Sequence, residues 1–332
     1  MALTSRHAVR ALLAPLLLSG CIEQGITNLN EVVGVPNPAG LGDVQVQDRI
    51  VQVQTPEVDV LWVVDNSCSM QAEQDALTAN FPLFMNYFLG SGLDYHVGVV
   101  STDMDNDTQQ GRLLSTGGKT WIDSSTPDPV STFSSLATLG TGGSGYERGR
   151  DATYWALEIR NDEENAGFLR PAATLSVVVI SDEEDDSDDV TLNEFILWLR
   201  GLKWSQDMVS FSSIVSQTEE CPLEIGTDYM SITSAMGGIT WDICSERWDA
   251  LLDQLGLQAA GLRREFFLSQ LPVPGSISVS IVEGDVTFSF IEGEDWEYDP
   301  QRNSVVFLEY IPDPMAQIFI DYTLLSSLEE AN

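Results

Sequence analysis

Residues 58–64 form a nearly unbroken apolar run, and polar residues follow it at once. A strand with one solvated face would alternate apolar and polar side chains, whereas a strand buried on both faces of a parallel sheet reads as continuous. The run therefore predicts a central parallel strand covered by helices on both sides. Two further short apolar runs, residues 97–100 and 175–180, each lead into a polar turn and predict two more strands of this kind.

Helical patterns alternate with these strands. Residues 70–89 carry apolar side chains at helical spacing, and Pro82 is expected to kink or break that helix. Thr191 and Glu194 are spaced as a capping box at the start of another helix. The alternation predicts an α/β fold with a doubly wound, mostly parallel sheet, whose ligands bind beyond the carboxyl ends of the strands. The remaining helices are expected at residues 146–160, 192–202, 228–236 and 247–257, with a strand at 208–215.

From about residue 265 the pattern changes to period two, with turns between the segments and no helix. Alternation of this kind predicts a small antiparallel β domain, sandwich-like in form. We therefore expect an α/β domain over residues 49–262 and a β domain over residues 263–332. The alternating segments are residues 276–282, 286–291, 305–310 and 317–322.

The first twenty residues have the form of an export signal. Arg6 and Arg10 precede an apolar run at residues 11–18, and small residues follow before Cys21. The run is far shorter than the roughly 20 residues that span a bilayer, so a transmembrane helix is not expected. An ordinary signal peptide remains an alternative to the lipoprotein signal described next.

The segment Leu18-Ser19-Gly20-Cys21 resembles the lipobox of bacterial lipoproteins, at which the signal is cut and the cysteine is lipidated. The resemblance implies a signal peptide over residues 1–20, lipidation at Cys21, and a membrane contact made by the lipid anchor alone. Ile22 rather than Asp favours the outer membrane within the bacterial cell envelope. Residues 21–48 are rich in Asn, Gly, Gln and Pro and predict a flexible tether.

Three cysteines remain beyond the anchor, and an exported protein is expected to form disulfides. Cys221 and Cys244 flank one helix-turn segment and are predicted to pair. Cys68 is then expected to be a buried free thiol.

The charge is strongly acidic. The chain has 51 Asp and Glu against 15 Lys and Arg, a formal net charge of -36. Such a polyanion repels nucleic acid and attracts divalent cations, so no nucleic-acid partner is expected. An acidic surface that only keeps the protein soluble is the alternative interpretation.

The segment Asp65-Asn66-Ser67-Cys68-Ser69 follows the first buried strand directly. This Asp-x-Ser-x-Ser pattern resembles the metal-ion-dependent adhesion site (MIDAS) of von Willebrand factor A (vWA) domains, over residues 56–260. A carboxylate and two hydroxyls on a tight loop suit a hard cation that prefers oxygen ligands. The resemblance implies a divalent cation, Mg²⁺ first and Ca²⁺ or Mn²⁺ as alternatives, held in part by Asp65, Ser67 and Ser69. The alternative is that Asp65 and Ser67 only cap the first helix.

The family adds a Thr or Ser from a second loop and an Asp from a third. Here Ser144 follows two glycines and precedes a helix, and Asp182 follows the strand at 175–180, so both are predicted ligands by resemblance. Thr141 and Thr102 are the alternatives to Ser144. Further carboxylates at residues 183–186 either raise the preference for Ca²⁺ or are solvated charge.

The sequence predicts a binding protein rather than an enzyme. Beyond the signal the only histidine is His96, and the chain has no Gly-rich phosphate loop, His-Glu-x-x-His helix or Cys-x-x-Cys pair. A core histidine and a core thiol explain His96 and Cys68 better than a catalytic pair does. In the family's mechanism a partner protein's carboxylate completes the metal site, which implies adhesion or assembly at the cell envelope. The alternative is a structural envelope protein whose metal only stabilises the fold.

Overall fold

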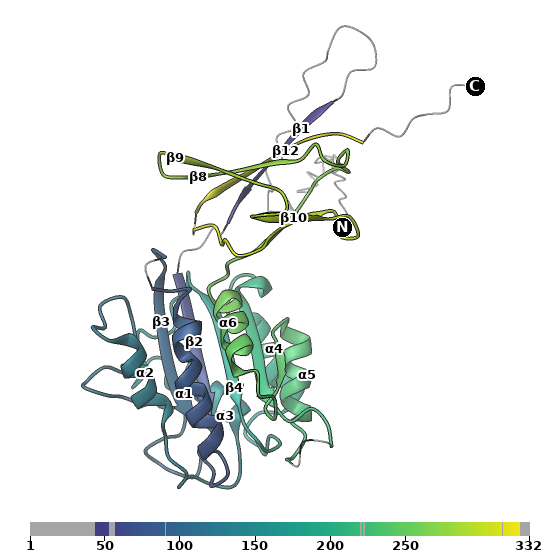
Figure 1. Cartoon of the computed structure of the whole chain (residues 1–332). Helices are drawn as coiled ribbons and strands as arrows, with labels where there is room; N and C mark the ends of the chain where they lie inside the picture. Colours follow the sequence, from purple (N-terminus) through teal and green to yellow (C-terminus); the bar gives the residue numbers. More distant parts are fainter. Residues whose placement is uncertain are drawn as a thin grey trace, which may run out of the picture.

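The computed structural model describes residues 44–52, 57–89, 91–219, 221, 223–313 and 315–325. The expected signal peptide, the lipidation site Cys21 and most of the expected tether lie outside these residues. Two parts are visible in Figure 1: an α/β domain, and a smaller β domain next to it. Within the described residues, no helix combines the length and the apolar character needed to cross a membrane.

A five-stranded parallel sheet forms the centre of the α/β domain, in the order β3-β2-β4-β5-β6. The apolar run at residues 58–64 lies in β2, between β3 and β4, and is fully buried. This arrangement confirms the prediction of a doubly wound parallel sheet. The strands are β2 (Glu57–Val64), β3 (Asp94–Ser101), β4 (Thr174–Ile180), β5 (Val209–Val215) and β6 (Thr240–Asp242).

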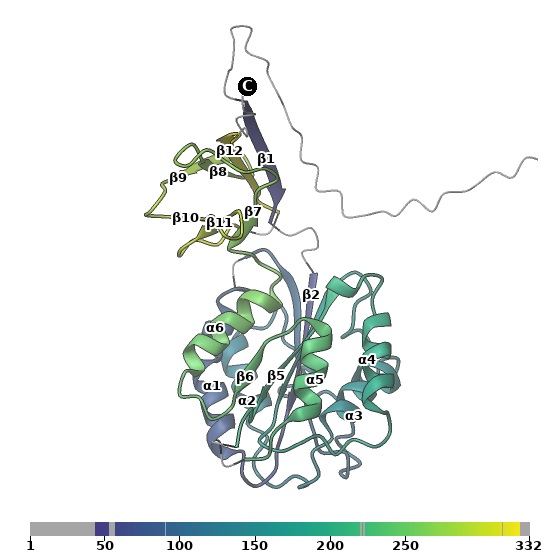
Figure 2. The same cartoon turned by 90° about the vertical axis from the view of Figure 1, so that its right-hand side faces the viewer.

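Helices cover both faces of this sheet (Figure 2). One layer consists of α1 (Gln71–Met85), α2 (Pro129–Ala137) and α6 (Trp248–Ala259), whose apolar side chains form one core. The other layer consists of α3 (Gly149–Tyr154), α4 (Leu192–Gly201) and α5 (Thr227–Met236). The helix expected at residues 146–160 is thus shorter, and it continues as a π-helical turn, η1 (Trp155–Ile159). A short 3-10 helix, η2 (Gln206–Met208), precedes β5.

The side chains of β2 explain why its sequence is continuously apolar. Val60 and Trp62 point into the core beneath α1 and α2, whereas Leu61 and Val63 point into the core beneath α3, α4 and α5. Trp62 packs edge to face against Phe84 at 5.4 Å between ring centroids, a favoured aromatic geometry. Each residue of the strand therefore meets an apolar layer, whichever face it occupies.

Two antiparallel sheets form the β domain, in the orders β1-β12-β8-β9 and β10-β11-β7. Ile281 and Ile320 from the first sheet share one core with Trp296 and Val305 from the second, which confirms the small antiparallel domain. The strands are β1 (Gln45–Val51), β7 (Glu265–Phe267), β8 (Ser278–Glu283), β9 (Val286–Phe290), β10 (Trp296–Asp299), β11 (Ser304–Phe307) and β12 (Gln317–Thr323).

Strand β1 corrects the expected domain boundaries. The sequence assigns residues 45–48 to the tether and residues 49–51 to the α/β domain. In the structure all seven residues form β1, which pairs antiparallel with the whole of β12. The inward side chains of β1 include Asp48, which is buried and accepts hydrogen bonds from Ser269 N at 2.8 Å and Tyr322 Oη at 3.0 Å. A charged residue at an inward position hides the alternation that marks a strand. The β domain therefore receives chain from both sides of the α/β domain.

Removal of β1 is expected to destabilise the β domain selectively. A chain starting at residue 53 would leave Asp48's partners unpaired and expose Ile318, Ile320 and Tyr322, which are fully buried. A domain of this size has only about 3–5 kcal/mol of stability to lose. Calorimetry with limited proteolysis, beside a chain starting at residue 22, should show loss of the β-domain transition and an unchanged α/β transition. Equal melting of both chains would contradict this role for β1.

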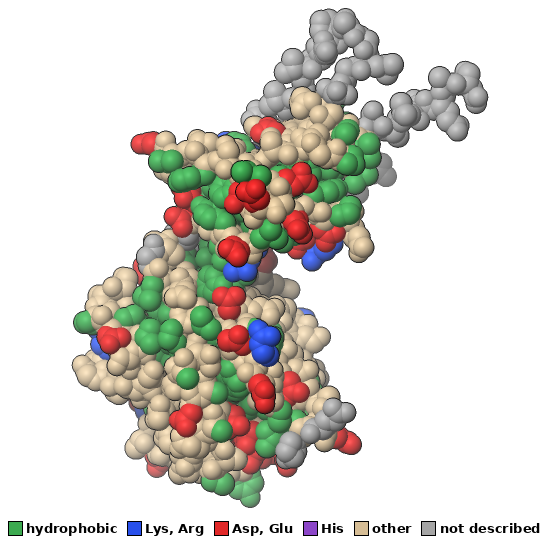
Figure 3. Space-filling model, in the orientation of Figure 1, with side chains coloured by type: hydrophobic (Ala, Val, Ile, Leu, Met, Phe, Trp, Pro, Cys, Tyr) green, Lys and Arg blue, Asp and Glu red, His purple; other side chains and the backbone are tan. Residues whose placement is uncertain are grey.

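Acidic side chains are spread over both domains on the face that Figure 3 shows, with few basic side chains among them. This distribution agrees with the net charge of -36 and offers no basic surface on that face for a nucleic acid.

Candidate metal centre

Three loops meet at the carboxyl edge of the sheet, because neighbouring parallel strands end on the same side. Asp65 follows β2, Thr102 follows β3, and Asp182 lies two residues after β4. These side chains are buried, with exposed fractions of 0% for Asp65 and Thr102 and 3% for Asp182. The structure thus brings Asp65 and Asp182, which the sequence placed after two buried strands, to the ends of the neighbouring strands β2 and β4.

The Asp65 loop is held by its own hydrogen bonds. Asp65 Oδ1 accepts from Ser67 N at 2.7 Å, and Asp65 Oδ2 accepts from Ser181 Oγ at 2.7 Å. The hydroxyl oxygens of Ser67 and Ser69 lie 3.2 Å apart. Helix α1 begins after Met70 and receives no side-chain cap, so Asp65 and Ser67 do not serve as helix caps. The loop places one carboxylate and two hydroxyls close together.

The second loop of the expected centre, which lies between α2 and α3 and contains Thr141, Ser144 and Glu147, differs from expectation. Ser144 is half-buried, and its Oγ donates to Asp105 Oδ2 at 2.7 Å, not to any group of the Asp65 loop. Thr141 is half-buried on the same loop. Thr102, the third candidate, is fully buried and donates its hydroxyl hydrogen to a carboxylate that the sequence reasoning did not single out, that of Glu147.

Glu147 is the residue that sequence reasoning missed. Its side chain is 0% exposed, and its Oε1 has no hydrogen-bond partner. Burial and the neighbouring charge of Asp65 raise the pKa of Glu147 to about 9. Asp182 Oδ1 is likewise buried without a partner. Buried polar atoms are nearly always paired, so two unpaired carboxylate oxygens beside Asp65 point to an ion or water that belongs there.

The electrostatics of the cluster favour a cation. Burial and the charge of Asp182 raise the pKa of Asp65, and burial with the charges of Asp65 and Asp182 raises the pKa of Glu183 to about 6. Within the described part of the chain, no Lys or Arg forms an ion pair with Asp65, Glu147 or Asp182. Carboxylate and hydroxyl oxygens are the donors that Mg²⁺, Mn²⁺ and Ca²⁺ prefer. The residues therefore fit a divalent cation.

Most of the acidic loop after β4 is structural. The Glu184 carboxylate accepts from Thr227 N at 2.8 Å and Asp228 N at 3.1 Å, so it caps the amino end of α5, where negative charge is stabilising. Asp185 pairs with Arg150 at 3.0 Å. These two carboxylates have structural partners, which leaves the exposed Asp186 as solvated charge and Glu183 beside Asp65 and Asp182.

Two other clusters bring three candidate ligand atoms within 4.8 Å of one another among the described residues. One contains Asp242 and the two disulfide cysteines, whose sulfur atoms are not free thiolates. The other contains Asp151 with Asp188 and Asp189, and the Arg148 guanidinium already forms ion pairs with all three. The carboxylates of the predicted centre are more widely spaced, so hydroxyls and waters would have to complete the coordination shell, as Mg²⁺ commonly allows.

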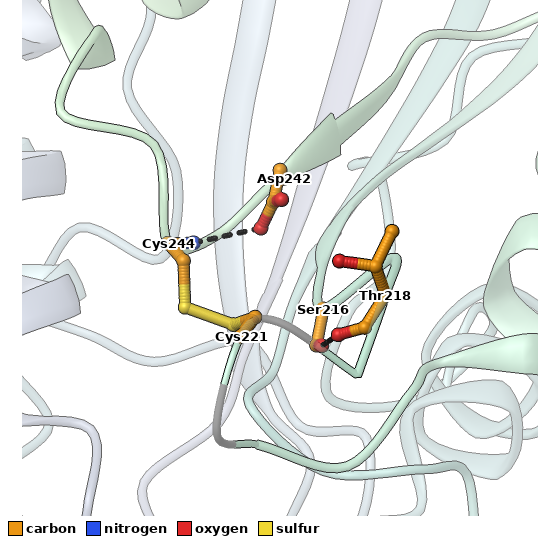
Figure 4. Close-up of a disulfide and its surroundings, with 5 residues drawn as sticks. All are labelled: Ser216, Thr218, Cys221, Asp242 and Cys244. Atoms are coloured by element: carbon orange, nitrogen blue, oxygen red, sulfur yellow. Dashed lines mark hydrogen bonds between the residues drawn. A yellow bond between two sulfur atoms is a disulfide. The ribbon is translucent and has the colours of Figure 1, made fainter.

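The predicted disulfide is confirmed, and the prediction for Cys68 is wrong. Cys221 and Cys244 are bonded, with their Cα atoms 5.9 Å apart, and Cys244 N donates to Asp242 Oδ1 at 3.0 Å (Figure 4). Cys68 is free but exposed, because it lies between Ser67 and Ser69 beyond the end of β2, where the loop turns toward solvent. His96 lies near the opposite end of its strand, hydrogen-bonded to Phe168 O, so it forms no pair with Cys68.

No protein-family model matches the chain, and no curated protein matches it in sequence. The fold is nevertheless a doubly wound α/β domain with a small β domain built from chain on both sides of it. The similar solved structures include a von Willebrand factor type A protein from Catenulispora acidiphila, with a TM-score of 0.44, 12% identity and 87% of this chain covered. Another is the pilus adhesin SpaC from Lactobacillus rhamnosus GG, with a TM-score of 0.48, 10% identity and 84% covered. The chain spans 63% of the first structure and 40% of the second.

Proposed function

We propose that this chain is a lipid-anchored protein of the bacterial envelope that binds a divalent cation and, through it, a partner protein. The proposal is carried by the buried carboxylate oxygens of Glu147 and Asp182, which lack partners beside Asp65. Leaving such groups unpaired costs about 1–3 kcal/mol each, or more when they are charged. A bound cation would remove this cost, which is the physical reason to expect one.

Asp65, Ser67, Ser69 and Asp182 are the residues that would hold the cation. Mg²⁺ fits the hydroxyl-rich set best, with Mn²⁺ or Ca²⁺ as alternatives. The bound ion would supply a positive centre to which a carboxylate oxygen of the partner could coordinate. Ser69 is exposed, so this side of the loop is open to a partner. Burial of Asp65 and its hydrogen bonds to Ser67 and Ser181 keep the carboxylate in place before the ion arrives.

Binding rather than catalysis is proposed because the described centre offers carboxylates and hydroxyls but no histidine or lysine beside them. Its thiol, that of Cys68, has no histidine base, since His96 lies near the far end of β3 and bonds to Phe168 O. We propose that Cys21 carries the lipid and that the chain between Cys21 and β1 links the folded domains to the outer membrane. The lipid would then be the only contact with the membrane.

The test is cation-dependent capture. The chain from residue 22 onward, which lacks the lipidated cysteine, is immobilised and exposed to bacterial envelope proteins in Mn²⁺ or in chelator. Specific partners should be retained in Mn²⁺, released by chelator, and not bound by the Asp182→Ala variant, with folding of the variant checked by circular dichroism. Retention that survives both chelation and Asp182→Ala would show that the cation does not mediate binding.

A second candidate is a structural envelope protein in which the cation only stabilises the fold. The burial of all three carboxylates, 0%, 0% and 3% exposed for Asp65, Glu147 and Asp182, favours it. It predicts that chelator lowers the thermal stability of the α/β domain while any partner remains bound at temperatures where the protein is folded. The capture experiment thus separates the two functions.

A further inference from the structure

We infer that Glu147 is itself a ligand of the cation, and that it contributes a carboxylate where the resemblance to vWA domains implies a hydroxyl from the second loop. This inference rests on the proposed metal centre. It states which residue of the second loop binds the cation, and how that residue affects the affinity of the centre and its preference among divalent cations.

The position of Glu147 supports this role. It lies two residues before α3, on the loop that carries Ser144 and Thr141, but unlike those residues it is fully buried. Its backbone carbonyl accepts from Asp186 N at 2.7 Å, which joins the second loop to the third. Glycine at 143 lets the second loop approach the first, since a Cβ there would lie 2.3 Å from Asn66 Oδ1. The three loops are thus packed together with Glu147 inside.

The hydrogen bonding of Glu147 leaves one oxygen available. Thr102 donates to Oε2 and fixes the side chain, whereas Oε1 has no partner. The neighbouring charge of Asp65 raises the pKa of the same carboxyl group. Two neighbouring carboxylates in a buried place repel each other unless a proton or a cation offsets their charge. A divalent cation satisfies both groups and the unpaired oxygen of Asp182.

A third carboxylate changes the chemistry of the centre. Together with Asp65 and Asp182, Glu147 more than balances the charge of a divalent ion, so the chain can hold the ion without a carboxylate from a partner. More carboxylate oxygens also favour Ca²⁺, which accepts more ligands and looser geometry than Mg²⁺. With Glu147 as a ligand, the metal centre should therefore bind Ca²⁺ and Mn²⁺ tightly without a partner protein.

The inference is tested by titrating Mn²⁺, Ca²⁺ and Mg²⁺ into the chain from residue 22 onward, in four forms. These are the wild type, Glu147→Gln, Asp65→Ala and the control Glu309→Gln, which removes the same charge from an exposed residue of the β domain. Glu147→Gln keeps the shape and the bond from Thr102. We expect it to weaken Ca²⁺ and Mn²⁺ binding at least about tenfold, with a smaller effect on Mg²⁺, while Glu309→Gln binds as the wild type does.

Two further measurements complement the titrations. The rise in melting temperature on adding Ca²⁺ should be smaller for Glu147→Gln than for the wild type, because the amide offers the ion no charged oxygen. In Glu147→Ala, bound Mn²⁺ should relax solvent water protons more strongly, because a water replaces the lost ligand.

The possible failures are distinguishable. If Asp65→Ala binds Mn²⁺ as the wild type does, the proposed metal centre itself is wrong. If Asp65→Ala loses Mn²⁺ but both Glu147 variants keep wild-type affinity and water relaxation, Glu147 is not a ligand and the proposed function stands. A lower melting temperature of metal-free Glu147→Gln with an unchanged response to Ca²⁺ would likewise assign Glu147 a purely structural role.

Discussion

Replacing Asp65 by alanine is expected to weaken cation binding at least about a hundredfold, because ligand charge is a main determinant of affinity in oxygen-ligand sites. Asp65 is the most central of the predicted ligands. It is fully buried, it follows the middle strand of the three that meet at the site, and its two oxygens organise Ser67 and Ser181. Its loss removes a charge and loosens the loop that carries the two hydroxyls.

The variant Asp65→Asn tests whether cation binding requires the charge of Asp65, because asparagine has nearly the same shape without the charge. An amide can still accept the hydrogen bond from Ser67 N, so the loop should stay folded while the negative charge is lost. Isothermal titration with Mn²⁺ should show the same loss of binding in Asp65→Asn as in Asp65→Ala. Asp105→Asn is the matched control, because Asp105 is exposed and accepts only from Ser144 in this loop region. Wild-type binding by Asp65→Asn would place the cation elsewhere.

Replacing Asp59 by alanine is expected to destabilise the α/β domain by about 3–5 kcal/mol, the cost of leaving a buried charge without its partner. Asp59 is fully buried in β2 and accepts from Arg170 N at 2.7 Å and Arg170 Nε at 2.8 Å. Lys203, whose side chain is 1% exposed, lies 3.8 Å away. Burial raises the pKa of Asp59 although Arg170 and Lys203 lower it, so the intact ion pairs add little to the stability of the domain. Removing Asp59, in contrast, leaves the buried charge of Lys203 without its carboxylate partner.

The control for Asp59 is Asp94→Ala. Asp94 pairs with the same Arg170 at 2.8 Å, but its side chain is 65% exposed. An exposed pair contributes about 0–1 kcal/mol, so Asp94→Ala should unfold in urea nearly as the wild type does. Because Asp59 and Asp65 are separated along β2 by roughly 20 Å, folded Asp59→Ala should still bind the cation. Similar unfolding of both variants would refute the buried-pair argument.

The sequence by itself determined the elements that depend on residues close together in the chain. The continuous apolar run predicted β2 between two layers, Thr191 and Glu194 predicted the start of α4, and Asp65 and Asp182 were each placed after a buried strand. Periodicity, capping and strand direction depend on neighbours in the chain, so they can be read without the fold. The disulfide followed from the few cysteines available.

Only the tertiary structure decided the features that depend on distant partners. Asp48 and Asp59 are polar residues in buried strands, and their partners lie far along the chain: Tyr322 is 274 residues from Asp48, and Arg170 is 111 residues from Asp59. Glu147 likewise becomes a candidate ligand only when its loop packs against Asp65. A sequence shows that a residue is charged but not what will neutralise it, so burial of charge is decided by the fold.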